Sequence, residues 1–95
     1  MKISFIITSF KEPKTIGKAI ESILNQNTKD LELIVTAPDK ETLDVARKYK
    51  QVIIIKDKGE GKPAALNLVV SKAKGDILIF TDGDVYVNNK SVLEL

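Results

Sequence analysis

Two carboxylates separated by a single glycine, Asp82 and Asp84, follow the apolar segment from Ile77 to Thr81. Side chains at positions i and i+2 leaving a strand point to the same side, so we expect the two carboxylates to converge. Two such charges about 5 Å apart repel by roughly 3 kcal/mol at an effective dielectric constant near 20. A divalent cation removes this repulsion, and one or two carboxylates together with substrate phosphates commonly hold Mg²⁺. The pair therefore predicts a Mg²⁺ or Mn²⁺ site, with Gly83 leaving room for a ligand near the backbone.

A simpler interpretation of Asp-Gly-Asp is a turn, because aspartate and glycine are among the commonest turn residues. Here the three residues close an apolar strand late in an alternating α/β pattern. Ligands of open α/β sheets bind at the carboxyl ends of strands. The position of the three residues therefore favours a binding site over a plain turn.

Four apolar, β-branched segments alternate with three amphipathic segments along the chain. We expect strands at residues 3–8, 31–36, 51–56 and 77–81, and helices with Pro13 in the first turn, after the N-cap Asp39 and from Pro63. Asp39 is placed to cap the second helix. Leu43, Ala46 and Tyr49 give that helix its apolar face, and Gly75 is expected to end the third helix, past Ala73. The alternation predicts an α/β three-layer sandwich with a parallel, Rossmann-like four-stranded sheet in the order 3-2-1-4.

The strand order 3-2-1-4 places the first and fourth strands side by side. The carboxyl ends of parallel neighbours meet at one edge of the sheet. The loop from Thr8 to Glu12 should therefore lie next to Asp82 and Asp84, so that two loops able to carry chemistry become adjacent.

The amino-acid composition excludes several classes of catalysis and of binding partner. The chain of 95 residues has the length of one domain, and it contains neither cysteine nor histidine, which excludes thiolate and imidazole catalysis and ligation. The net charge of +2 comes from scattered lysines, and Arg47 is the only arginine, so nucleic acid is not an expected partner. No apolar run approaches the roughly 20 residues of a transmembrane segment. We expect a cytoplasmic location, at the cytoplasmic membrane face if the chain belongs to a longer enzyme.

Four ordered motifs resemble the N-terminal half of family 2 glycosyltransferases, which have the GT-A fold. Residues 3–12 resemble the family's first strand and its loop, and residues 20–26 resemble its first-helix signature. Residues 61–67 resemble a Gly-Lys-x-x-Ala-Leu-Asn stretch, and residues 74–84 resemble the strand that delivers a D-x-D motif. Where the family carries Asp-Asp-Gly-Ser after the second strand, this chain has Thr-Ala-Pro-Asp, which leaves Asp39 as the acidic candidate.

The resemblance implies a domain that binds a nucleotide-diphosphate sugar, a UDP- or GDP-sugar, through Mn²⁺ or Mg²⁺. It implies that Asp84 ligates the metal with support from Asp82. It also implies six donor-binding residues, which are Thr8, Ser9, Glu12, Asp39, Lys62 and Asp82. Lys62 also suits phosphate because it lies at an expected helix N-terminus.

Structural alternatives exist for several of these residues. Lys62 can be an ordinary surface lysine, Ser9 or Glu12 can cap the helix after Pro13, and an N-cap role explains Asp39 fully.

The chain continues for eleven residues after Asp84, and none of its residues matches the family's catalytic base. We therefore expect residues 1–95 to form a single donor-binding domain that lacks the acceptor half and does not transfer sugar by itself. The outer edge of the fourth strand, with Val85, Val87, Val92 and Leu93, is expected to support a homodimer.

Two other functions remain open. One is a small α/β metal-binding interaction or regulatory module without transferase activity. The other is a haloacid-dehalogenase-like phosphatase, whose D-x-D motif normally follows the first strand and not the fourth.

Overall fold

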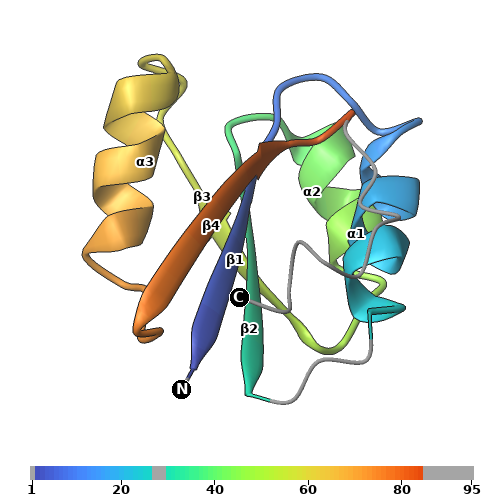
Figure 1. The fold of residues 1–95 in the computed structure, drawn as a ribbon. Coiled ribbons are helices and arrows are strands. Elements are labelled where there is room, and N and C mark those ends of the chain that lie inside the picture. The colour runs from blue at the N-terminus through green and yellow to red at the C-terminus, as the bar shows by residue number, and fades with distance from the viewer. Residues whose placement is uncertain (1, 27–29, 85–95) are drawn as a thin grey trace.

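The computed structural model describes residues 2–26 and 30–84 of the chain (Figure 1). Strands and helices alternate in these residues as β1 (Ile3–Thr8), α1 (Ile16–Leu24), β2 (Leu31–Ala37), α2 (Lys40–Ala46), β3 (Val52–Lys56), α3 (Lys62–Val70) and β4 (Ile77–Asp82). The sheet has the order β3-β2-β1-β4, and every neighbouring pair is parallel. The predicted fold class and strand order are therefore confirmed.

The central strand β1 sets the register of the sheet. All six of its residues are buried, as its unbroken apolar and β-branched sequence requires of a strand covered on both faces. Thr8, its last residue, pairs with Thr36 of β2 on one side and with Asp82 of β4 on the other. The carboxyl ends of these three strands therefore lie level at one edge of the sheet.

Two helices cover one face of the sheet and one helix covers the other (Figure 1). The larger core lies under α1 and α2 and comprises Phe5, Ile7, Ile16, Ala19, Ile20, Ile23, Leu33, Val35 and Ala46. The smaller core, under α3, comprises Ile6, Ile34 and Val69. The strand periodicity of two explains this division, because neighbouring residues of β1 and β2 point to opposite faces.

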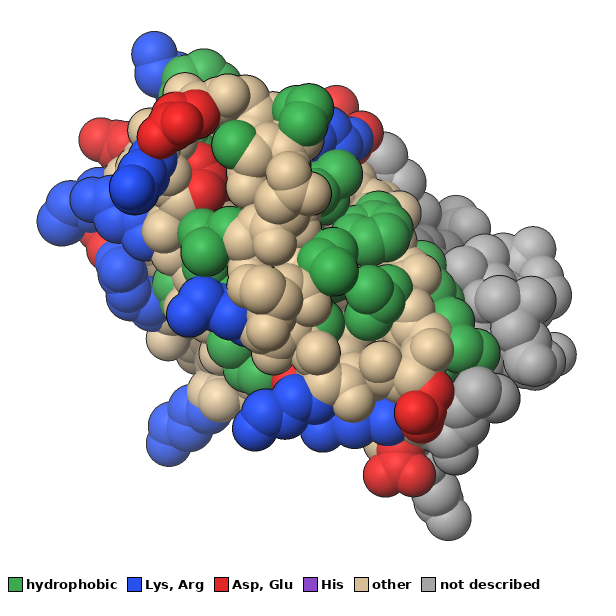
Figure 2. Space-filling view, turned by 90° about the vertical axis from the view of Figure 1, so that its left-hand side faces the viewer, with side chains coloured by type: hydrophobic (Ala, Val, Ile, Leu, Met, Phe, Trp, Pro, Cys, Tyr) green, Lys and Arg blue, Asp and Glu red, His purple; other side chains and the backbone are tan. Residues whose placement is uncertain are grey.

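The face under α3 is less completely covered than the other face. Ile53 pairs in register with Ile34, and Phe80 pairs with Ile6, so both point to the α3 side, where they stay partly exposed. Figure 2, which views the molecule from this side, shows apolar side chains at the surface beside a margin of lysines.

The predicted end of α3 was wrong. The helix ends at Val70, five residues before Gly75, and Ser71 is its C-cap. The backbone amides of Lys74 and Gly75 donate across the fold to Glu32 and to Ser4 Oγ, at 2.9 and 2.8 Å, in place of helical partners. A Cβ on Gly75 would lie 2.5 Å from the Ser4 amide nitrogen, so close packing explains this glycine.

Two smaller boundaries also differ from the prediction. Helix α1 begins at Ile16, and Pro13 lies in the turn before it. Tyr49 lies beyond the end of α2, although it packs against the larger core and its hydroxyl donates to Glu21 at 2.8 Å. The valines and Leu93 expected at a dimer contact lie outside the described residues. No helix in residues 2–26 or 30–84 combines the length and apolarity that a membrane span needs.

Candidate functional site

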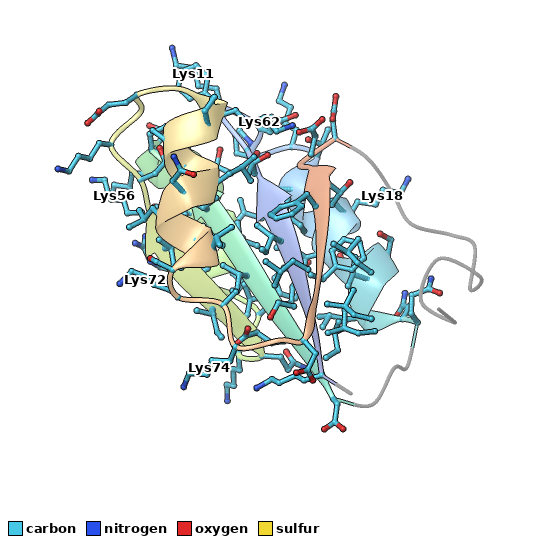
Figure 3. The ribbon with its side chains drawn as sticks, turned by 60° about the vertical axis from the view of Figure 1, so that its left-hand side comes forward. Lys11, Lys18, Lys56, Lys62, Lys72 and Lys74 are labelled. Atoms are coloured by element: carbon cyan, nitrogen blue, oxygen red, sulfur yellow. The ribbon has the colours of Figure 1, made fainter. Side chains whose placement is uncertain are left out.

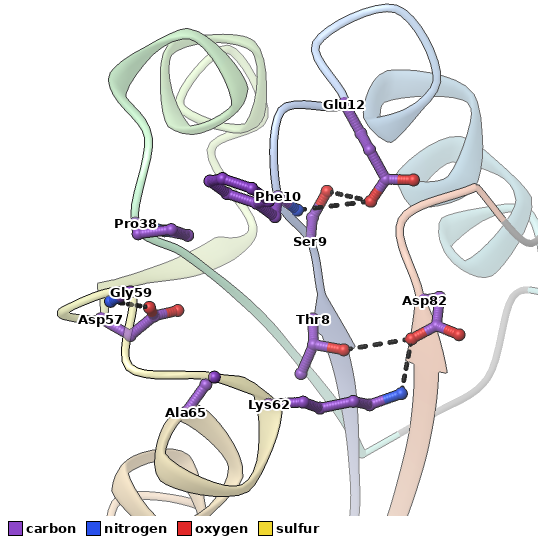
Figure 4. A pocket seen from close by; sticks show the side chains of 11 residues that line it. Thr8, Ser9, Phe10, Glu12, Pro38, Asp57, Gly59, Lys62, Ala65 and Asp82 are labelled. Atoms are coloured by element: carbon purple, nitrogen blue, oxygen red, sulfur yellow. Dashed lines mark hydrogen bonds and ion pairs between the residues drawn. The ribbon is translucent and has the colours of Figure 1, made fainter.

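A cavity of about 390 Å³ opens at the edge of the sheet where β1 and β4 end (Figure 4). Eleven residues line it: Thr8, Ser9, Phe10, Glu12, Pro38, Asp57, Gly59, Gly61, Lys62, Ala65 and Asp82. Five of the seven site residues predicted from the sequence are in this set, and Asp39 and Asp84 are not. The adjacency expected between the first loop and the end of the fourth strand is therefore present for Asp82.

Lys62, Asp82 and Thr8 form a contact group on one side of the cavity. Lys62 is the first residue of α3, and its Nζ lies 2.7 Å from Oδ1 of Asp82. Thr8 Oγ1 donates to the same oxygen at 3.3 Å. The hydrogen bond from Lys62 is the main reason that the pKa of Asp82 lies below its usual value, so Asp82 is an anion at neutral pH. Both charged side chains are about half exposed, so water screens their attraction.

The loop after β1 is held by its own polar side chains. Ser9 Oγ donates to Glu12 Oε1 at 2.7 Å, and the Phe10 amide donates to the same oxygen at 3.4 Å. Lys11 has a φ of 53°, and its amide donates to Asp39 Oδ1 at 2.9 Å. The Glu12 carbonyl then accepts from Ile16, where α1 begins.

Gly83 has a different role from the one expected. A Cβ at this position would lie 2.8 Å from Ser9 Cβ and 2.9 Å from Glu12 Oε1. The space beside Gly83 is therefore filled by the protein's own loop and is not room for a ligand. The glycine is needed because the β4 turn passes directly over Ser9.

Asp39 caps α2, as predicted. Its Oδ2 accepts from the Thr42 amide at 3.1 Å and from the Thr42 hydroxyl, while Oδ1 accepts from Lys11. Burial acts most strongly on the pKa of this carboxyl and raises it, but the Lys11 and Thr42 hydrogen bonds together outweigh burial and lower the pKa. Both oxygens of Asp39 thus have structural partners, and its role in donor binding stays a prediction.

Asp84 lines a second cavity of about 430 Å³, with Lys11, Glu12, Pro13, Lys14 and Thr15. Glu12 borders both cavities. Residues 2–26 and 30–84 contain no group of three acidic, cysteine or histidine side chains arranged to hold a metal ion. The aspartates on either side of Gly83 supply hard oxygen ligands of the kind that Mg²⁺ and Mn²⁺ take, but phosphate or water oxygens must complete the coordination.

Six lining residues were not predicted as site residues, and Asp57, Phe10 and Pro38 are the ones with the larger side chains. Asp57 directly follows β3, is 8% exposed, and accepts from Thr36 Oγ1 at 3.0 Å and from the Gly59 amide at 2.8 Å. The rule that drew attention to Asp82 at the end of β4 applies equally to Asp57 at the end of β3. Phe10, 60% exposed, and Pro38 form an apolar part of the cavity wall. A large aromatic in a polar loop was the available signal for Phe10.

The described residues form a Rossmann-like α/β domain with a cavity at the carboxyl edge of a parallel sheet, where ligands of such sheets bind. The sequence matches Glycosyl transferase family 2 over residues 4–95, and the chain belongs to that family.

Named relatives agree with this family. The chain is 32% identical over 104 residues to a poly(ribitol-phosphate) beta-glucosyltransferase of Bacillus spizizenii, covering 98% of this chain and 16% of that protein. It is 32% identical over 89 residues to a cholesterol galactosyltransferase of Borreliella burgdorferi, covering 87% of this chain and 25% of that protein. The chain therefore spans a quarter or less of the length of these two relatives.

Solved structures share the fold. The crystal structure of residues 1–349 of Staphylococcus aureus TarS in complex with UDP superposes with a TM-score of 0.82 at 25% identity. The superposition covers 99% of this chain and 30% of that one. The GT-A assignment made from the sequence motifs is confirmed.

Proposed function

We propose that this chain is the donor-binding part of a glycosyltransferase and that it binds a nucleotide-diphosphate sugar in the 390 Å³ cavity. The observation that carries the proposal is the gathering of Thr8, Ser9, Glu12, Lys62 and Asp82 around one cavity at the carboxyl edge of the sheet. The structural likeness to a transferase solved with UDP supports the same ligand class, and UDP is the first candidate among the nucleotides.

The diphosphate is assigned to Lys62 and the N-terminus of α3. Helix α3 has nine residues, and its first turn presents backbone N–H groups and the positive end of the helix dipole. Lys62 adds a full positive charge at the same place, and Gly61, with a φ of 101°, turns the chain into the helix without a side chain. A diphosphate bound here would draw the Lys62 ammonium away from Asp82.

The base is assigned to the part of the cavity between the loop after β1 and the ends of β2 and β3. Phe10 and Pro38 offer apolar surface for the flat face of a base (Figure 4). Asp57 accepts one hydrogen bond on each of its carboxylate oxygens, from Thr36 and from Gly59. A carboxylate oxygen has a second lone pair, so Asp57 can also accept from an N–H of uracil or guanine.

The divalent cation, Mn²⁺ or Mg²⁺, is assigned to Asp84 with support from Asp82. These two carboxylates would hold the cation, which would supply positive charge to neutralise the donor diphosphate. Both contacts that hold Asp82 go to its Oδ1, from Lys62 and Thr8.

The acceptor and the catalytic base are not assigned to any residue. We propose that the 95-residue chain binds the donor without transferring its sugar. The homodimer and the cytoplasmic location stay predictions.

Isothermal titration calorimetry of the chain with UDP, GDP and their sugar conjugates, with and without Mn²⁺, tests the proposal. We expect nucleotide binding that strengthens when Mn²⁺ is present. We also expect UDP to compete with UDP-sugars for the same site. Binding of Mn²⁺ without any affinity for a nucleotide diphosphate would instead identify a metal-binding interaction or regulatory module.

A further inference from the structure

The turn that carries the two aspartates is held against the loop after β1 by a close steric fit. The Gly83 amide donates to the Thr8 carbonyl at 3.0 Å, so the sheet pairing continues one residue past β4. A Cβ on Gly83 would collide with Ser9 Oγ and would lie 2.8 Å from Ser9 Cβ. Real Cβ atoms essentially never approach heavy atoms within 3.0 Å, so no side chain fits between Gly83 and Ser9.

The loop side of this contact has little freedom to move. Ser9 is 9% exposed, and its backbone amide donates to the Thr36 carbonyl at 3.0 Å, which anchors it to β2. Its hydroxyl donates to Glu12 Oε1 at 2.7 Å, so the serine side chain is fixed as well. Glu12 Oε1 lies on the same side and would be 2.9 Å from a Cβ on Gly83. Ser9 and Glu12 together therefore form a rigid surface under the turn.

The consequence concerns the residues that flank Gly83. Asp82 lines the 390 Å³ cavity and Asp84 lines the 430 Å³ cavity, so the two aspartates lie on either side of the point where Gly83 rests on Ser9. A displacement of the turn by a few tenths of an ångström would move both carboxylates relative to Lys62 and to the diphosphate site.

We infer that Ser9 and Glu12 are positioning residues: their hydrogen-bonded pair fixes the Asp82–Asp84 turn through contact with Gly83. This role rests on the proposed function, because it concerns the metal-binding turn of that site. This positioning role differs from a direct contact with the donor, because the Ser9 hydroxyl donates its hydrogen bond to Glu12 Oε1.

A steric cycle tests the contact between Gly83 and Ser9. Gly83→Ala should weaken Mn²⁺-dependent UDP binding by about tenfold or more, since small misplacements of site groups have effects of this size. Ser9→Gly in the same chain removes both Ser9 atoms that the new methyl group would meet, but it also removes the hydrogen bond to Glu12, so the double variant should regain part of the affinity and not all of it. The readouts are UDP calorimetry, the electron paramagnetic resonance spectrum of bound Mn²⁺, and the melting temperature.

Gly75→Ala is the matched control, because its Cβ would meet Ser4 at the opposite end of β4. Ser9→Gly should not rescue the loss of stability caused by Gly75→Ala. If Gly83→Ala does not fold, the double variant decides: a folded double variant supports the contact, and an unfolded one overturns it.

Glu12 is tested by a conservative pair of substitutions. Glu12→Gln keeps an oxygen that accepts from the Ser9 hydroxyl, so it should weaken the binding of UDP and Mn²⁺ clearly less than Glu12→Ala does. Equal losses in the two variants would mean that Glu12 acts through its charge, as a metal ligand, and would overturn the positioning role.

The outcomes separate the two proposals. If the parent binds UDP with Mn²⁺ and Gly83→Ala binds equally well, the positioning role is overturned and the proposed function stands. If the parent binds no UDP but its Mn²⁺ spectrum is changed by Gly83→Ala and restored by Ser9→Gly, the proposed function fails and the positioning role stands.

Discussion

The Lys62 ammonium group lies 2.7 Å from Oδ1 of Asp82, and this ion pair joins the first residue of α3 to the last residue of β4. Both partners line the proposed donor cavity (Figure 4). In the proposed site, a diphosphate would compete with Asp82 for Lys62, and a divalent cation would compete with Lys62 for Asp82. Cation and nucleotide diphosphate should therefore strengthen each other's binding, because each releases the partner that the other needs.

Lys62→Ala should weaken UDP binding by about tenfold or more and leave uridine binding nearly unchanged. The reason is that a charged hydrogen bond to phosphate contributes about 1.5–3 kcal/mol, while the nucleoside, assigned to the side of the cavity with Phe10 and Asp57, would not contact the ammonium group. Calorimetry with UDP and with uridine measures the difference.

Lys58→Ala is the matched control for charge, because Lys58 lies in the same loop before α3 but outside the donor cavity. An equal loss of UDP affinity in the two variants would show that overall charge, and not the Lys62 position, governs binding. Figure 3 shows Lys62 at the edge of the sheet, apart from Lys56, Lys72 and Lys74.

Asp84→Asn should abolish the dependence of UDP binding on Mn²⁺ and leave the melting temperature unchanged or slightly raised. Asp84 is exposed, and its substitution removes one of two nearby negative charges without breaking a contact of the core. Asp82→Asn should also weaken metal binding, and it should cost at most about 1 kcal/mol of stability through the exposed ion pair with Lys62. Mn²⁺-dependent UDP affinity at parental strength in Asp84→Asn would show that the metal site is misassigned.

The layout of the sheet was predictable because it depends on local pattern. Continuous apolar runs predict strands buried on both faces, and alternation with helices leaves few right-handed arrangements. This pattern also placed Asp82 beside Thr8, since both end neighbouring parallel strands. The same reasoning applied to the third strand would have added Asp57.

The positions that sequence reasoning misjudged depend on contacts between distant segments. Gly75 was expected as a helix terminus and Gly83 as space for a ligand, and each proved to be a place where the backbone passes over a serine. The early end of α3 has the same origin, because Glu32 and Ser4 capture the amides of Lys74 and Gly75. No local pattern around residues 70–75 predicts a hydrogen-bond acceptor some forty or seventy residues away in the sequence.

Phe10→Ala should weaken binding of both UDP and uridine by about tenfold and leave stability nearly unchanged. The ring is 60% exposed in the unliganded protein, so its loss removes little core packing, while stacking of a base on an aromatic contributes about 1–3 kcal/mol. Phe80→Ala supplies the control, since Phe80 is 45% exposed and does not line the cavity. Parental uridine affinity in Phe10→Ala would place the base elsewhere.

Glu32→Gln should reduce the free energy of unfolding at neutral pH, and the reduction should shrink in acid. Glu32 is 8% exposed and accepts from Ser4 Oγ at 2.6 Å and from the Lys74 amide at 2.9 Å. Burial is the strongest single influence on its pKa and raises it, but these two bonds and the charges of Lys2 and Lys74 together outweigh burial and lower the pKa.

Because the pKa of Glu32 is lower in the folded chain than in the unfolded chain, the unfolded state binds the proton more readily. The stabilisation is therefore complete above the unfolded pKa and disappears as the pH falls through the folded pKa. We expect the parent to exceed Glu32→Gln by about 2 kcal/mol at pH 7, and the difference to close below about pH 4. Urea unfolding between pH 3 and pH 7 measures it, with Glu60→Gln in the exposed loop before α3 as the control for removing one charge. A difference that stays constant across this range, or grows in acid, would mean that the Glu32 carboxylate does not hold the segment between α3 and β4 to β1 and β2.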